Sequence, residues 1–279
     1  DGGHQRQSSK TAQESFLNFL YEITGADKDK GEKIRIRSWF FSHAHDDHIY
    51  FCKALLDRYH SDLNLESVMF NFPSYQVING GYAVSTFEVK ESIRQHYPDC
   101  KVVKLHTGQN FSMQGVDFQV LYTHEDAVNN AGTTTISNFN DSSTVLKMTM
   151  DGKSFMLLGD CSGKCRELLL KMYSAQTLRS DCLQVAHHGY DDLPDLYAAV
   201  GAPLAFFCNS RANSGVEPGH HNHTKYLGVK NAAPNVDTLF ADNTYKMTVK
   251  DGQLAYEEIP SYRSAFKTLR VPNLSQNLL

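Results

Sequence analysis

The stretch His43-Ala44-His45-Asp46-Asp47-His48 follows directly on the apolar run Trp39-Phe40-Phe41 and carries three imidazoles within six residues. Imidazole and carboxylate ligands together suit Zn, Mn or Fe. Because side chains alternate in an extended segment, His43 and His45 point the same way. The last two residues of the stretch lie where the chain turns into a helix and face the same pocket from another side. The alternative is a polar turn that happens to be His-rich, and the number of histidines favours a metal site.

The composition is that of an ordinary globular protein, with 279 residues, 41% hydrophobic and 21% charged. A chain of this length buries a substantial core without disulfides or structural metals. The formal net charge of -4 lends no support to nucleic acid as a partner, although a local basic groove would still allow it. The longest apolar runs are far short of the roughly 20 residues of a membrane-spanning helix.

Six cysteines are scattered along the chain without a Cys-x-x-Cys pair, namely Cys52, Cys100, Cys161, Cys165, Cys182 and Cys208. We expect them to be reduced, which favours a cytoplasmic protein. Cys52, Cys182 and Cys208 lie in apolar runs and are predicted to be small core residues. The first residues, Asp1-Gly2-Gly3, are typical of a strand entering a loop, so we expect residues upstream; a secreted protein is the alternative if a signal segment preceded them.

Hydrophobic periodicity predicts alternating helices and strands. Helices are expected over residues 11–24, 49–59, 86–97 and 164–173. Strands are expected over 34–42, 67–72, 100–105, 116–122, 143–150, 154–158, 183–187, 202–208, 236–241, 245–249 and 253–257. Asp151-Gly152 and Asp251-Gly252 indicate hairpin turns. Residues 129–141 and 209–223 are predicted loops. The pattern predicts one domain over 1–259, with two mixed sheets packed together and helices outside, and a tail over 260–279.

Two later predicted strands are also followed by side chains that can bind a metal. Leu157-Leu158-Gly159-Asp160 ends in a Gly-Asp pair that alone would be a simple turn. Beside a His cluster, Asp160 becomes a candidate bridging ligand, and Gly159 would permit close backbone approach. Val185-Ala186-His187-His188-Gly189 again delivers histidines at a strand end. Alternation leaves open which of His187 and His188 faces the cleft.

A third constellation lies in the predicted loop, where Gly219-His220-His221-Asn222-His223 carries three histidines. It is either a solvated surface cluster or a functional loop, since loops at strand ends often carry function.

In this order the constellations resemble the metallo-β-lactamase fold superfamily: H-x-H-x-D-H, then Gly-Asp after a strand, then His after a later strand. The finer pattern is similar to the hydrolase domain of ComEC-type DNA-uptake proteins and their soluble relatives, in Ala186-His187-His188-Gly189, Gly219-His220 and the initial Asp1-Gly2-Gly3. The resemblance spans nearly the whole chain. It implies a four-layer αββα sandwich with the site at one edge of the two sheets.

The resemblance also implies a dinuclear centre with two divalent ions, Zn or Mn. His43 and His45 would bind the first ion. Asp47 and His48 would bind the second, completed by His188 or His187, and Asp160 would bridge both. A hydroxide held between the ions would be the nucleophile. Asp47 would then take part in catalysis, and His220 or a neighbour would hold a phosphate oxygen or protonate the leaving group.

Many members of the superfamily supply a third histidine to the first ion, and this chain has no histidine at that place. Asn140 or Asp141 occupies that place, and such an oxygen ligand binds Zn more weakly than imidazole does and suits Mn or Mg better. The first site is therefore expected to be weak or to fill only with substrate. His106 and His124, further upstream, are spare candidates.

The favoured function is a metallo-hydrolase of a phosphoester or phosphodiester, a phosphodiesterase-like enzyme whose substrate is a small molecule or a polymer. The same nucleophile attacks carbon, so hydrolysis of a lactone, thioester or β-lactam is an alternative, against which the missing imidazole argues mildly. A non-catalytic metal-binding module is a third possibility, against which Asp47 and Asp160 argue. The sequence does not indicate the substrate or the oligomeric state.

Overall fold

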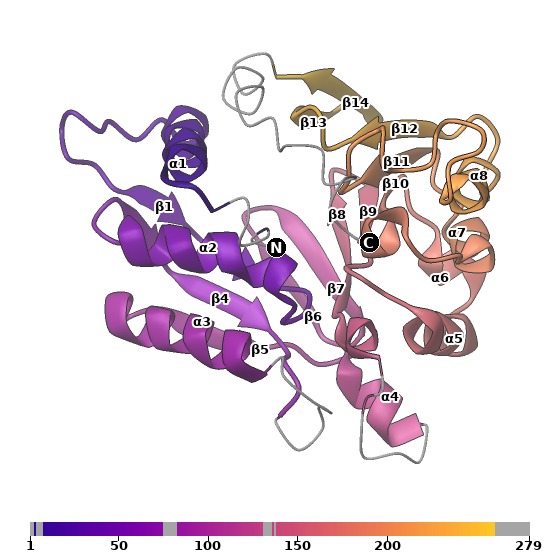
Figure 1. Ribbon diagram of the computed structural model, residues 1–279, viewed down its shortest axis with the longest axis horizontal. Coiled ribbons are helices and arrows are strands. Elements are labelled where there is room, and N and C mark those ends of the chain that lie inside the picture. The colour runs from indigo at the N-terminus through magenta and orange to yellow at the C-terminus, as the bar shows by residue number, and fades with distance from the viewer. Residues whose placement is uncertain (1–2, 4–7, 75–82, 131–135, 137, 260–279) are drawn as a thin grey trace, which may run out of the picture.

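The computed structural model describes residue 3, residues 8–74, 83–130, 136 and 138–259. The tail predicted for 260–279 and the residues Asp1 and Gly2 lie outside this range. Two sheets dominate the fold, with helices on their outer faces (Figure 1). Within the described range, no helix is long and apolar enough to cross a membrane.

The first half of the chain builds the smaller sheet region. Its elements are α1 (Lys10–Thr24), β1 (Ile34–Ile36), β2 (Trp39–Phe40), α2 (Asp46–Arg58), β3 (Leu63–Leu65), β4 (Ser67–Phe70), α3 (Ala83–His96) and β5 (Lys101–Lys104). Strands β2-β4-β5 pair in parallel, and so do β1 and β3. The N–H of Glu66 donates to the Ile36 carbonyl at 2.9 Å and connects the two ladders. The strand predicted over 34–42 is thus interrupted after Ile36.

The second half builds a seven-stranded sheet in the order β12-β11-β10-β9-β8-β7-β6. Its elements are β6 (Asn110–Met113), β7 (Val116–Tyr122), α4 (His124–Asn130), the 3-10 turn η2 (Phe139–Ser142), β8 (Val145–Met150), β9 (Lys153–Leu157), α5 (Gly163–Met172), α6 (Ala175–Leu178), β10 (Cys182–Gln184), η3 (Ala186–Gly189), α7 (Pro194–Val200), β11 (Leu204–Phe207), α8 (His223–Lys230) and β12 (Asp237–Phe240). A separate hairpin, β13 (Tyr245–Lys250) and β14 (Gln253–Glu258), follows. Strands β9 to β12 are parallel neighbours, and β6 to β9 are antiparallel.

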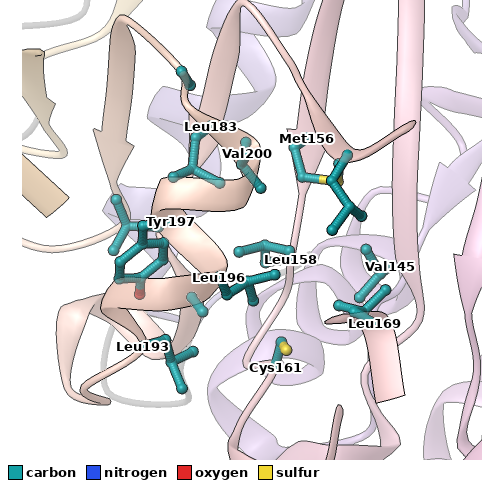
Figure 2. Packing of buried hydrophobic residues seen from close by; sticks show 14 of the residues in the cluster. Val145, Met156, Leu158, Cys161, Leu169, Leu183, Leu193, Leu196, Tyr197 and Val200 are labelled. Carbon is teal, nitrogen blue, oxygen red and sulfur yellow. The ribbon is translucent and has the colours of Figure 1, made fainter. Parts of the chain in front are cut away.

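Apolar packing defines the layers. One cluster fills the space between the large sheet and helices α5 and α7, where Leu158, Leu169 and Leu196 are fully buried (Figure 2). A second cluster joins the small sheet to α2 and α3. Phe40 of β2 and Leu157 of β9 meet in a third cluster, so the two sheets face each other. The mixed architecture of four layers, α-β-β-α, agrees with the sequence prediction.

Both predicted Asp-Gly turns form. Asp151 and Gly152 have φ of 49° and 76°, and Asp251 and Gly252 have 51° and 72°. Left-handed backbone at both central residues is what a two-residue hairpin loop needs, because it matches the twist of the strands.

Several elements differ from the sequence prediction. Helix α2 begins at Asp46 rather than residue 49, since acidic side chains are favourable in a first helical turn. The predicted loop over 129–141 includes the end of α4 and the turn η2. The strand predicted over 183–187 ends at Gln184. Cys208 is exposed rather than a core residue, because it lies beyond the last residue of β11. All six cysteines are free.

Candidate metal centre

Four segments converge at one edge of the facing sheets. They are the loop after β2, the first turn of α2, the turn after β9 and the turn η3 after β10. A backbone hydrogen bond fixes their relative position, since the N–H of Thr144 donates to the Ser42 carbonyl at 2.8 Å. Residues of the sequence motif beginning at His43 are therefore brought beside Asp160, which lies in the other half of the chain.

Asp160 lies at the centre of the site and is 1% exposed. Its Oδ2 atom lies 3.2 Å from Nε2 of His48, 3.6 Å from Nε2 of His188, 3.8 Å from Nε2 of His43 and 3.9 Å from Nε2 of His187. Its Oδ1 atom is buried and has no hydrogen-bond partner in the described part of the chain. An unpaired buried carboxylate oxygen is costly, so this atom is available to a cation.

Gly159 permits the carboxylate to reach this position. Its φ is +55°, and a Cβ atom there would lie 2.8 Å from Cβ of Ser42 and 3.1 Å from Cβ of Ser143. The N–H of Asp160 donates to Oγ of Ser143 at 3.0 Å. The close approach expected from the Gly-Asp pair is therefore present, and only glycine fits it without strain.

The donor atoms form two groups that share Asp160. Within each group all donor atoms lie within 4.8 Å of one another, and the groups are Asp47, His48, Asp160 and His188, and His43, His45 and Asp160. Nε2 of His48 and Nε2 of His188 are 3.2 Å apart, and Nε2 of His43 and Nδ1 of His45 are 3.0 Å apart. Neighbouring ligands at about 2.0–2.1 Å from one ion are themselves about 3.0–3.4 Å apart. The residues present therefore fit two divalent ions.

Electrostatics favour the metal-binding forms of several of these donors, whereas burial at His188 is outweighed by the hydrogen bond to Asp47 and the charge of Asp160, which together raise the pKa of His188. Burial, with the nearby positive charge of other imidazoles, lowers the pKa of His43 well below its usual value. Burial works to raise the pKa of Asp160, but the hydrogen bond with His48 and the charges of the surrounding imidazoles together outweigh it, and the pKa is lowered. The pKa of Asp47 is likewise lowered, because its hydrogen bond with His188 and the charges of His48 and His188 together outweigh its burial. A neutral imidazole and ionised carboxylates are the forms that ligate.

The turn η3 presents both of its histidines to the site. His187 and His188 have φ of 47° and 54°, in the left-handed region. Such residues cost about 1–3 kcal/mol each and persist where the surroundings hold them. Nδ1 of His188 lies 3.1 Å from the Cys208 carbonyl, and Nδ1 of His187 lies 3.1 Å from Oδ2 of Asp191. Strand alternation does not apply here, because the strand has already ended.

The two oxygen donors considered for the first ion have different surroundings. Asn140 is buried, its Nδ2 lies 3.2 Å from Nε2 of His187, and its Oδ1 has no hydrogen-bond partner among the described residues. Oδ1 of Asp141 accepts from the N–H of Cys165 at 2.9 Å, in the first turn of α5. Burial raises the pKa of Asp141. Asn140 is thus the member of the pair with an oxygen open to a ligand.

The three other candidate histidines have Nδ1 engaged outside the two donor groups. Nδ1 of His220 accepts from the N–H of Asn222 at 3.1 Å within its own loop. Nδ1 of His106 lies 2.7 Å from Glu125, and Nδ1 of His124 lies 3.1 Å from the Asn71 carbonyl. A catalytic role for His220 stays a prediction.

Two groups near the site were not anticipated from the sequence. Asp191 follows His187 by four residues, and that spacing was the available signal. The Cys208 carbonyl is a backbone group, so no side-chain pattern could have indicated it.

No protein-family model and no curated protein matches this chain. Among solved structures it is similar to the metallo-beta-lactamase fold protein YhfI from Bacillus subtilis, with a TM-score of 0.43 and 12% identity over 80% of this chain and 78% of that one. It is also similar to Zn(2+)-bound PqqB from Methylobacterium extorquens, with a TM-score of 0.35 and 12% identity over 60% and 51%. The diiron β-hydroxylase CmlA from Streptomyces venezuelae has a TM-score of 0.35 and 12% identity over 73% and 34%.

The chain spans about half the length of the PqqB chain and about a third of that of CmlA.

Proposed function

We propose that this protein is a metal-dependent hydrolase with a dinuclear centre that cleaves a phosphoester or phosphodiester. The observation that carries the proposal is the sharing of one buried carboxylate, Asp160, by two groups of imidazole and carboxylate donors. A single structural ion would need only one closed group of four donors.

In this proposal, His43, His45 and Asp160 hold the first ion. Asp47, His48, His188 and Asp160 hold the second. The ions are Zn or Mn, because the donors mix imidazole with carboxylate oxygen. When bound, two such ions supply Lewis acidity and a low pKa for water, and they stabilise both the attacking and leaving oxygens of an in-line displacement.

The chain's own residues set the geometry of that chemistry. The backbone N–H of Asp160 donates to the Ser143 hydroxyl, which anchors the residue that the two groups share. The side chain of Asp47 is 38% exposed, the most accessible of the carboxylates in the two groups, so it lies on the face from which substrate arrives. Nδ1–H of His188 donates to the Cys208 carbonyl, which directs Nε2 at the site.

Phosphoester chemistry is favoured over carbonyl chemistry by the donor set. The first group has two imidazoles and one carboxylate, and Asn140 adds an unpaired oxygen nearby. Oxygen-rich sites suit Mn and Mg, which are common partners of phosphate groups. His220 is the proposed leaving-group acid or phosphate contact, carried by a loop that begins beside the site, where Nδ2 of Asn209 donates to the His188 carbonyl at 3.3 Å.

The test combines metal content with an assay panel. Purified protein is analysed for bound metal and assayed with added Mn or Zn on bis-phosphate, monophosphate, nucleic-acid, lactone and β-lactam substrates. We expect activity on a phosphodiester or monophosphate that is lost in Asp47→Ala and Asp160→Ala. Asp195→Ala is the matched control, because Asp195 pairs with Arg166 at the surface.

Each outcome separates the alternatives. Activity only on lactone or β-lactam substrates would replace the phosphoester proposal with a carbonyl hydrolase. At most one bound ion and no activity on any ester would leave a metal-binding module. Full activity in both site variants would refute the assignment of the residues.

A further inference from the structure

His187 and His188 are presented to the same carboxylate in the same way. In each ring, Nδ1 faces an acceptor at 3.1 Å, which is Asp191 for His187 and the Cys208 carbonyl for His188. In each ring, Nε2 lies less than 4 Å from Oδ2 of Asp160, at 3.9 Å and 3.6 Å. A metal-binding histidine characteristically has its other nitrogen anchored in this way.

His188 and His187 differ in which donor group they adjoin. Nε2 of His188 lies 3.2 Å from Nε2 of His48 and belongs to that group. His187 belongs to neither group, and its Nε2 lies 3.2 Å from Nδ2 of Asn140. Asn140 takes the chain position expected to serve the first ion, and Asp160, whose Oδ2 lies 3.9 Å from Nε2 of His187, also belongs to the group that has only three donors.

From this juxtaposition we infer that His187 is the missing imidazole of the first ion, anchored by Asp191, so that the two adjacent histidines serve one ion each. The inference rests on the proposed dinuclear centre and deepens it. In this assignment His187, from the turn η3, takes the role of the third histidine that is absent from the sequence near Asn140.

The distances are compatible with this assignment. Two ligands of one ion lie at most about 4.2 Å apart when each bond is about 2.1 Å. The separation of 3.9 Å between His187 and Asp160 is within that limit. Because His187 is outside the group of His43 and His45, its ring must shift toward them when an ion binds, with the backbone in place.

Backbone strain gives an independent reason. Asn and Asp tolerate left-handed φ better than His does, yet histidines occupy two successive left-handed positions. In this conformation both rings have Nε2 within 4 Å of Oδ2 of Asp160. Gly189, with φ of +85° and the Phe207 ring 2.9 Å from a would-be Cβ, closes the turn.

The experiment measures metal binding and needs no activity. Metal-free protein is reloaded with Mn or Zn, and bound ions are counted by elemental analysis, with affinities from chelator competition. His187→Asn is the main variant, since asparagine keeps the left-handed backbone. We expect two ions in the wild type and one in His187→Asn. Asp191→Asn is expected to retain both ions, with one weakened about 10- to 100-fold.

Double variants show which ion His187 serves. His187→Asn combined with His45→Ala removes two donors of the same group, and one ion is expected to remain. His187→Asn combined with Asp47→Ala weakens both groups, and no ion is expected to remain. His106→Ala, which removes an imidazole paired with Glu125 outside the site, is the control and is expected to bind two ions.

The inference is overturned if His187→Asn binds two ions with wild-type affinity, or if its combination with Asp47→Ala retains one. It is also overturned if Asn140→Ala loses an ion while His187→Asn does not, because Asn140 would then be the donor. A wild-type protein that binds fewer than two ions would sink the proposed dinuclear centre as well, so the two failures are distinguishable. Where His187→Asn does not fold, the expected weakening in Asp191→Asn decides the question.

Discussion

Nε2 of His48 and Nε2 of His188 lie 3.2 Å apart, although 140 residues separate them in the chain. Two imidazole nitrogens at this distance repel each other through their lone pairs unless a proton or a cation lies between them. Oδ2 of Asp160 lies 3.2 Å from the first and 3.6 Å from the second. A cation bound between these atoms would therefore stabilise the contact between the two segments that carry His48 and His188.

Metal loading is expected to stabilise the fold. A ligand that binds only the native state stabilises it by about 2.7 kcal/mol when present at 100 times its Kd. We therefore expect added Mn or Zn to raise the melting temperature of metal-free protein, and a chelator to reverse the rise. In Asp160→Ala the rise should shrink to a small fraction, because this change removes the shared donor. An equal rise in that variant would contradict the bridging role of Asp160.

Gly159→Ala is expected to destabilise the protein and to weaken metal binding. The new Cβ would lie 2.8 Å from Cβ of Ser42, and φ is +55°. Overpacking and left-handed strain together cost about 2–4 kcal/mol. Gly152→Ala separates these effects, because its φ is +76° with no atom within 4 Å. We expect Gly152→Ala to lower the free energy of unfolding by about 1 kcal/mol, measured by denaturant unfolding. Equal losses in both variants would show that the close contact with Ser42 is unimportant.

The core beneath Asp160 is expected to tolerate truncation poorly. Leu158 is fully buried and packs in the cluster between the large sheet and its helices (Figure 2). Leu158→Ala should lower the free energy of unfolding by about 2–5 kcal/mol in urea denaturation. Leu227→Ala, at a side chain that is 39% exposed, is the matched control and should cost less than about 0.5 kcal/mol. A smaller loss of unfolding free energy in Leu158→Ala than in Leu227→Ala would contradict the placement of Leu158 in the core.

His124 is expected to make stability depend on pH. Burial lowers the pKa of His124 and outweighs its hydrogen bond to the Asn71 carbonyl. The unfolded chain therefore binds a proton at higher pH than the folded one, so this contribution is present above about pH 6.5 and is lost as the pH falls below it. In His124→Gln we expect a smaller loss of stability between pH 7 and pH 5, measured by urea unfolding of metal-free protein. An unchanged pH dependence would refute the assignment.

The sequence predicted the parts of the site that local patterns determine. The stretch around His43 and His45 follows strand β2, and the Gly-Asp pair at Asp160 follows strand β9, so both could be located from residue order. The positions of Asp191 and of the Cys208 carbonyl depend on how distant segments pack. His187 and His188 were ambiguous because their backbone turns left-handed after Gln184, which no alternation pattern conveys.

Much of the fold followed from hydrophobic periodicity, and the exceptions were short elements. Strand β3, with three residues, and strand β6, with four, are too short to show an alternation that differs from a loop. Helix α7 begins with Pro194, a favourable first residue of a helix, but it has only seven residues. Cys208 lies at the end of an apolar run, where residue type does not indicate whether the strand continues.

The hydrogen bond from Thr144 to Ser42 joins the two halves of the chain directly beneath the donors. Neither half contains a complete group, since His43, His45, Asp47 and His48 belong to one, and Asp160, His187 and His188 to the other. A bound ion would therefore act as a crosslink that closes a long chain loop, much as a disulfide does. A substitution that weakens the contact between the two halves would then also lower the affinity for metal.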